Sequence, residues 1–174
     1  YSNFKAAKPL YQKMVDIAEE SGSTLKGSAY NVMAHNYLFS GDAETARENY
    51  DRAIALAKSP IAVVNLSFYK LNSYLFQNDY EGALLLAQDL YNKLNHLGFT
   101  EASLNQQKAR VEFAKFLSYA NNQQKEEAYS ALNTRKNYAA AAMALMEVDE
   151  VRQRNFDAYN AQMEAWYYIL FGEY

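Results

Sequence analysis

Residues 30 to 60, YNVMAHNYLFSGDAETARENYDRAIALAKSP, constrain the fold more than any other stretch of the chain. From Tyr30 to Tyr37, apolar and aromatic side chains recur at i, i+3, i+4 and i+7, which is one face of an α-helix. Ser40-Gly41-Asp42 interrupts this pattern, and helical spacing then resumes. Gly41 can adopt the positive φ that ends a helix, and Asp42 can cap the next one. So short a connection forces neighbouring helices to lie antiparallel, and the stretch therefore predicts a helical hairpin.

The same residues resemble the tetratricopeptide repeat. That motif has a large aromatic, a Leu-small pair, a Tyr, a Gly-Asp turn, an Ala, an aromatic and an Ala, in this order. The matching residues are Tyr30, Met33-Ala34, Tyr37, Gly41-Asp42, Ala46, Tyr50 and Ala53, and Pro60 arrives two residues later than in the commonest form. The resemblance implies an all-α fold, in which antiparallel helix hairpins stack as a right-handed α-solenoid of about three to four units.

Weaker copies of the pattern flank this hairpin. Residues 1–21 align with residues 40–60, so the sequence opens on the second helix of a pair whose first helix is missing. Pro9 removes an amide donor, and we expect this helix to start late or to bend there. Further pairs are expected at 25–58, 61–95 and 101–147, the last being degenerate, with a turn at Asn121-Asn122-Gln123. The whole chain, 1–174, is expected to form a single helical repeat domain.

The spacing of the repeats is long. Equivalent alanines at positions 7, 46, 83 and 128 are 39, 37 and 45 residues apart, whereas the commonest tetratricopeptide repeat has about 34 residues. Such lengths resemble the repeats of maltose-regulator-type transcription activators and other bacterial signalling proteins.

Two interpretations compete for the C-terminal region, residues 149–171. A mostly apolar seam runs from Ala128 to Leu170, and no Gly or Pro occurs between Glu126 and Gly172. In the first interpretation a helix ends near Val148, the chain bends at Asp149-Glu150, and a terminal helix caps the array. This capping helix would bury Phe156, Tyr159, Met163 and Trp166. In the second, one long helix leaves the array and pairs with a second copy as a coiled-coil homodimer.

Composition excludes several classes of protein. The 174 residues include no cysteine, which rules out disulfides, thiolate catalysis and cysteine-ligated metals. A net charge of −3 argues against a nucleic-acid surface. No run approaches 18 apolar residues, so we expect no membrane insertion. Only 6 Gly and 2 Pro occur alongside 50% hydrophobic residues, which favours an all-α chain over a sandwich or barrel.

We expect no catalysis, no metal and no cofactor. His35 and His96 are the only histidines, and neither lies in a metal-binding spacing. No phosphate-binding loop or nucleophile-elbow string occurs, and no nucleophile–base pair can be named. Because the sequence begins inside a helical pattern without an initiator Met, it is expected to belong to a longer protein. The resemblance implies a bacterial protein, and the absence of cysteine fits the cytoplasm and the periplasm equally well.

The resemblance implies a protein or peptide ligand on the concave face, which the first helix of each pair lines. Asparagine can hold a peptide backbone because its amide both donates and accepts, and Arg110 could take a carboxylate. The lysines of the heat-shock-chaperone clamp are missing. The expected lining residues are Asn31, His35, Leu38, Phe39, Asn65, Phe68, Tyr69, Asn72, Arg110, Phe113 and Leu117.

The alternative function is a sensory or regulatory segment of a bacterial signalling protein, upstream of a kinase, cyclase or DNA-binding output domain. Residues 149–165 loosely resemble the helices that follow such repeats. The sequence that follows Tyr174 in the gene would distinguish the two functions.

Overall fold

The computed structural model describes residues 4–147 and 149–172, and the side chains from residue 6 onward. In this part of the chain 83% of residues are helical and no strand occurs, which confirms the all-α prediction. Eight helices are described: α1 (Phe4–Glu20), α2 (Lys26–Phe39), α3 (Ala43–Ala55), α4 (Pro60–Phe76), α5 (Tyr80–Leu94), α6 (Glu101–Asn121), α7 (Lys125–Ala144) and α8 (Glu150–Phe171).

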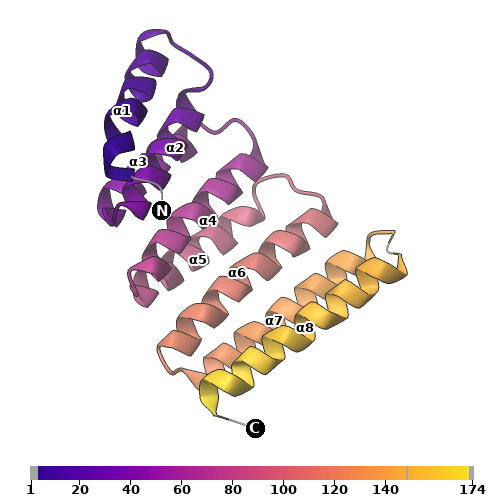
Figure 1. Cartoon of the computed structure of the whole chain (residues 1–174). Coiled ribbons are helices and arrows are strands. Elements are labelled where there is room, and N and C mark those ends of the chain that lie inside the picture. The colour runs from indigo at the N-terminus through magenta and orange to yellow at the C-terminus, as the bar shows by residue number, and fades with distance from the viewer. Residues whose placement is uncertain (1–3, 148, 173–174) are drawn as a thin grey trace. The chain divides into compact units, whose positions relative to one another are not determined.

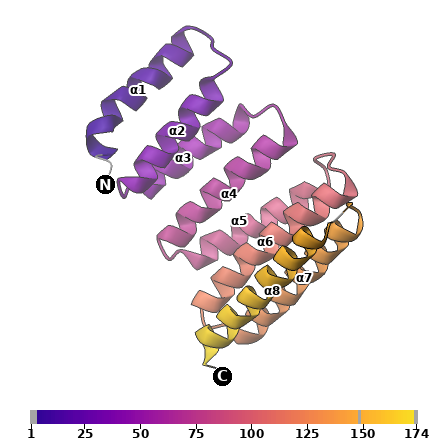
Figure 2. The same cartoon turned by 45° about the vertical axis from the view of Figure 1, so that its right-hand side comes forward.

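The chain divides into two compact units, residues 1–79 and 80–174. The division falls at the turn of the pair expected at 61–95. In the first unit successive helices from α1 to α4 run antiparallel, and each packs on the next (Figures 1 and 2). Its apolar core consists of Val15, Ala18, Ala29, Tyr30, Met33, Ala34, Tyr37, Ala46, Tyr50 and Ala53.

The α2–α3 hairpin forms where the local signals predict it. Gly41 has a φ of 92°, which a residue with a Cβ rarely adopts. The Asp42 carboxylate accepts a hydrogen bond of 3.2 Å from the backbone N–H of Thr45 and so caps α3. Ala34 and Ala46 are fully buried, and their small side chains allow the two helices to approach closely.

Pro9 lies inside α1, which begins at Phe4. The expected late start is therefore wrong. Because Pro9 is near the helix start and exposed, its missing N–H leaves only one carbonyl, in the first turn of the helix, without an intrahelical partner. Water can bind such a carbonyl, so the loss is tolerated.

In the second unit α6 and α7 form a long hairpin, α5 packs on α6, and α8 packs on both α6 and α7 (Figures 1 and 2). The α6–α7 turn contains Gln123 at a φ of 59°. The core that α8 completes consists of Phe116, Ala120, Ala128, Ala131, Leu132, Met163 and Tyr167.

The second interpretation of the C-terminal region, one long helix, is wrong. Helix α7 ends at Ala144 and α8 begins at Glu150. The Asp149 carboxylate accepts a 2.8 Å hydrogen bond from the backbone N–H of Arg152, which caps α8 as a separate helix. A helix end was expected near Val148, and this residue lies outside the described part of the chain. The packing of α8 on α6 and α7 within one chain agrees with the capping interpretation.

The buried face of α8 differs from the expected one. Met163 is 2% and Tyr167 4% exposed, whereas Tyr159 and Trp166 are each 42% exposed. Phe156 is half-buried. The expected burial of Tyr159 and Trp166 is wrong. That expectation assumed that the apolar seam is the buried face, whereas α8 turns a polar residue, Asn160, towards α7.

Candidate functional site

The first unit contains a groove that three of the predicted site residues line. This α2–α4 groove has a volume of about 440 Å³ and lies between the start of α2, the end of α3 and the start of α4. Pockets for small ligands fall in the same size range. Its lining consists of Thr24, Gly27, Ser28, Asn31, Ala53, Leu56, Ala57, Lys58, Ala62, Asn65, Leu66 and Tyr69.

Two local features position the helices around the groove. The start of α2 packs against the end of α3 at Gly27: a Cβ there would lie 3.4 Å from the Cβ of Leu56 and 3.7 Å from the carbonyl oxygen of Ala53, which are ordinary van der Waals distances. The Ser59 hydroxyl accepts a 3.3 Å hydrogen bond from the backbone N–H of Ala62, and Pro60 occupies the first turn. Together these residues define where α4 begins.

Asn31 lines this groove and carries an unusual polar atom. Its side-chain oxygen is buried, and no residue in the described part of the chain donates a hydrogen bond to it. A buried acceptor without a partner costs about 1–3 kcal/mol. A ligand N–H in the groove would reach this oxygen only if the Asn31 side chain turned into the groove.

His35 lies one turn further along α2. Its Nδ1 is 2.8 Å from the backbone carbonyl oxygen of Asn31. A carbonyl oxygen can only accept, so Nδ1 carries the hydrogen, and Nε2 of the neutral ring is an acceptor. The contact orients the imidazole.

Aromatic rings surround this imidazole. The His35 ring centroid is 4.8 Å from that of Tyr69 and 5.4 Å from that of Tyr50, both in edge-to-face geometry. Such pairs are favoured because the positive edge of one ring meets the negative face of the other. Tyr50 is fully buried, and burial raises the pKa of its hydroxyl above the ordinary value. Tyr69 is exposed and gives the groove an aromatic wall.

The predicted site residues of the first unit are divided between the groove and its surroundings. Asn31, Asn65 and Tyr69 line the groove, and His35 contacts Tyr69 from the side. The others do not line it: Leu38 packs against the core, Phe68 is buried, and Phe39 and Asn72 are exposed.

The three remaining predicted residues belong to α6 of the second unit. Phe113 and Leu117 pack against the core cluster that α8 completes. Arg110 is exposed, and its Nη1 donates a 2.7 Å hydrogen bond to Gln107 Oε1. None of the three lines the α2–α4 groove.

Sequence reasoning missed Gly27 and Lys58. Gly27 carried no decisive signal, because it lies in the first turn of α2 and a Cβ there would make only ordinary contacts. Lys58 carried no signal in the sequence. It follows the end of α3, and it lines a groove only because α4 packs beside that end.

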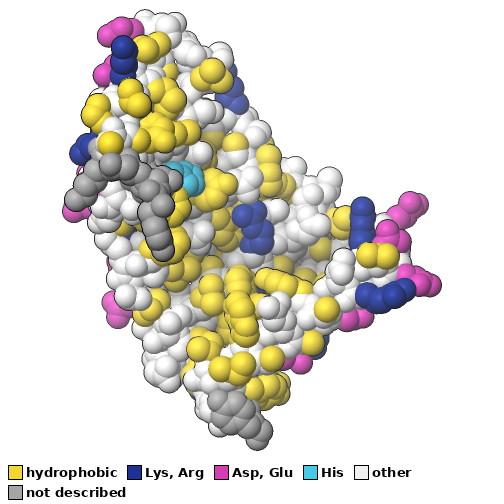
Figure 3. Space-filling view, viewed as in Figure 1, with side chains coloured by type: hydrophobic (Ala, Val, Ile, Leu, Met, Phe, Trp, Pro, Cys, Tyr) yellow, Lys and Arg dark blue, Asp and Glu magenta, His cyan; other side chains and the backbone are white. Residues whose placement is uncertain are grey.

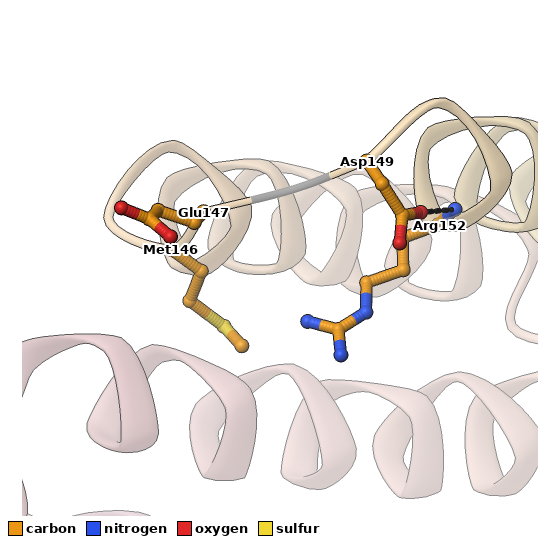
Figure 4. A pocket seen from close by; sticks show the side chains of 4 residues that line it. All are labelled: Met146, Glu147, Asp149 and Arg152. Atoms are coloured by element: carbon orange, nitrogen blue, oxygen red, sulfur yellow. Dashed lines mark hydrogen bonds between the residues drawn. The ribbon is translucent and has the colours of Figure 1, made fainter.

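A second hollow lies at the α7–α8 connection and is lined by Met146, Glu147, Asp149 and Arg152 (Figure 4). The side chains of Met146 and Arg152 extend to the same side, whereas Glu147 turns away. The one hydrogen bond drawn there is the helix cap from Arg152 N–H to Asp149. Because these groups serve the cap or diverge, we assign no ligand to this hollow.

Within residues 4–147 and 149–172, no three His, Asp or Glu side chains gather as a metal site requires. None of the helices described is both long and apolar enough to cross a bilayer.

Comparison with known proteins yields no match, either to a protein-family model or to a curated protein. The resemblance to the tetratricopeptide repeat therefore stays a prediction from the residues.

Proposed function

We propose that this chain is a non-catalytic scaffold of tetratricopeptide-like hairpins, stacked as a right-handed α-solenoid, whose α2–α4 groove binds a peptide. Three of the residues expected from the resemblance line one groove in the first unit, which supports the proposal. The hairpin geometry around Gly41-Asp42 supports it further.

The observation that carries the proposal is the convergence of Asn31, from α2, and Asn65, from α4, on one groove. A peptide in extended conformation presents backbone N–H and C=O groups at regular intervals, and side-chain amides can pair with both. Asn65 lines the same groove from α4 and can both donate and accept. Tyr69 offers an aromatic wall to an apolar side chain, and Lys58 an ammonium group to a carboxylate.

Selection from a displayed library of random peptides tests this function. The selected peptide is titrated into the wild type and into Asn31→Ala and Asn65→Ala. We expect a roughly tenfold weaker Kd for each variant, which corresponds to the loss of one hydrogen bond of about 1.4 kcal/mol.

Asn72→Ala is the matched control, because Asn72 lies on the same helix two turns beyond Asn65, is exposed, and does not line the groove. It should leave the Kd unchanged. Failure to enrich any peptide, or equal binding by all three variants, would contradict the proposal.

A further inference from the structure

The α2–α4 groove has two ends that differ in chemistry. Ala62 lies in the first turn of α4, and Tyr69 lies two turns further along the same helix. Because an α-helix rises about 1.5 Å per residue, these two ends of the groove are about 10 Å apart along α4. Lys58 comes just before α4 and therefore belongs to the end near Ala62.

Lys58 gives its end of the groove a positive charge. No other residue of the lining is charged. In the part of the chain that the structure describes, no ion pair includes Lys58. By contrast, the ammonium of Lys26 at the start of α2 lies 3.7 Å from a carboxylate oxygen of Glu19. The Lys58 ammonium is thus the group in this groove that suits a ligand carboxylate.

Tyr69 makes the other end of the groove aromatic. Its ring meets that of His35 edge to face, and its centroid is 6.3 Å from that of the fully buried Tyr50. These contacts hold the Tyr69 ring, which is 41% exposed. An aromatic side chain of a ligand would extend the cluster in the geometry that aromatic pairs favour. Figure 3 shows hydrophobic side chains exposed over α1 and α2, so other apolar groups of a ligand would also find partners on this unit.

Asn65 lies between the two ends, one turn after Ala62 and one turn before Tyr69, and Asn31 lines the groove from α2. Their amides suit a peptide whose backbone N–H and C=O groups are free. An extended peptide of the polyproline II type has no internal hydrogen bonds, rises about 3.1 Å per residue and completes a turn in three residues. Side chains three positions apart in such a peptide therefore point the same way and lie about 9 Å apart, which matches the length of the groove.

We propose that the α2–α4 groove selects peptides with an aromatic residue and an acidic residue three positions apart. The aromatic ring lies against Tyr69, and the side-chain carboxylate lies beside Lys58. This inference rests on the proposed function and names the class of peptide that the groove binds.

The sequences selected from the random library give the first test. We expect them to share an aromatic residue and an Asp or Glu three positions away from it. Enrichment of peptides without this pair, or with the pair at no fixed spacing, overturns the inference and leaves the proposed function standing. Failure to enrich any peptide contradicts both.

Changes in the selected peptide test the two contacts and their spacing. Replacing its acidic residue by the corresponding amide should weaken the Kd about three- to fivefold, as for an exposed ion pair, and less at high salt. Replacing the aromatic residue by leucine should weaken it roughly two- to tenfold. Inserting one glycine between them should cost as much as losing the acidic residue, because the carboxylate then turns away from Lys58.

The peptide is acetylated and amidated in these titrations, so that its side chain supplies the carboxylate. Loss of binding on amidation would identify a terminal carboxylate as the ligand group and would overturn the inference. A Kd that ignores the acidic residue would also overturn it.

Lys58→Gln tests the cationic end in the protein. This variant should bind the acidic peptide and its amide equally, because the charge that distinguishes them is gone. Lys26→Gln is the matched control: it removes the same charge from a residue outside the groove lining, and it should keep the wild-type preference. A Lys58→Gln variant that still prefers the acidic peptide overturns the inference.

Tyr69→Leu tests the aromatic end. It should remove the preference for the aromatic peptide over its leucine form. Phe76→Leu is the control, because Phe76 lies on the same helix, is 69% exposed and does not line the groove. Circular dichroism verifies that the variants are folded, and the peptide substitutions test the same contact in the wild type. An unchanged preference in a folded Tyr69→Leu variant overturns the inference.

Discussion

The guanidinium of Arg135 in α7 donates a hydrogen bond of 2.5 Å to the side-chain oxygen of Asn160 in α8. Both residues are only 6% exposed. Burial lowers the pKa of Arg135 below its ordinary value, and the facing Tyr159 opposes this shift. The Tyr159 ring lies 4.5 Å from the guanidinium carbon, a cation–π contact. In the described part of the chain no carboxylate forms an ion pair with Arg135, so Asn160 and Tyr159 stabilise a buried charge.

Removing the acceptor should therefore destabilise the second unit. Asn160→Leu leaves the buried guanidinium without its hydrogen bond, and we expect the free energy of unfolding to fall by about 2–3 kcal/mol in a urea titration. Adding Arg135→Met removes the unpaired charge and should restore most of the loss. A double variant no more stable than Asn160→Leu alone would show that the hydrogen bond is not the cause.

Ala46 tests the register of the α2–α3 hairpin. It is fully buried, whereas Ala55 on the same helix is exposed. Ala46→Leu should lower the free energy of unfolding by roughly 1–3 kcal/mol, because overfilling a close helix crossing forces the helices apart. Ala55→Leu is the matched control and should change it little. Equal effects at both sites in denaturant unfolding would contradict the register.

Met163 and Trp166 test the face that α8 buries. Met163→Ala should reduce the free energy of unfolding by about 2–5 kcal/mol, since it removes a buried side chain from the core of the second unit. Trp166→Ala should have a small effect, because this larger side chain is partly exposed. Thermal unfolding provides the measurement. A greater loss for Trp166→Ala would favour the seam that the sequence predicted.

Tyr50 carries a buried hydroxyl with no hydrogen-bond partner among the described residues. Tyr50→Phe should raise the free energy of unfolding at neutral pH by about 1 kcal/mol, because the unpaired hydroxyl no longer has to be desolvated. Tyr69→Phe, at an exposed ring, should change it little. A clear loss of stability in Tyr50→Phe would indicate that the hydroxyl has a partner.

The same tyrosine predicts a dependence on alkaline pH. Burial raises the pKa of Tyr50, and a hydrogen bond with Tyr138 raises the pKa of Tyr91 to about 12. In the unfolded chain a tyrosine hydroxyl has its ordinary pKa of 10.0, and in the folded protein these two hydroxyls have a higher pKa. The stabilising contribution of each protonated hydroxyl is therefore fully present below pH 10 and is lost as the pH rises towards the folded-state pKa. The urea midpoint should therefore fall above pH 10, and fall less steeply in Tyr50→Phe. A midpoint that is constant to pH 11.5 would contradict this.

Part of the candidate site could be predicted because helix periodicity places residues on faces. Asn31, Asn65 and Tyr69 were expected on the first helices of their pairs, and they line one groove. Phe68 is one position from Tyr69 and is buried, because one residue turns a helix face by about 100° and a small error in register moves a side chain from the groove to the core. Arg110 belongs to a separate unit, and no local pattern predicts the boundary at residue 79.

The sequence by itself determined the helices and the α2–α3 turn, because helical periodicity, the positive φ of Gly41 and the Asp42 cap act within a few residues. Only the tertiary structure decided which face of α8 is buried, since the contact of Arg135 with Asn160 joins residues 25 positions apart, and a 4-3 apolar pattern does not encode it. It also decided that Asn31, Asn65 and Tyr69 line one groove, because that groove exists only where three helices meet.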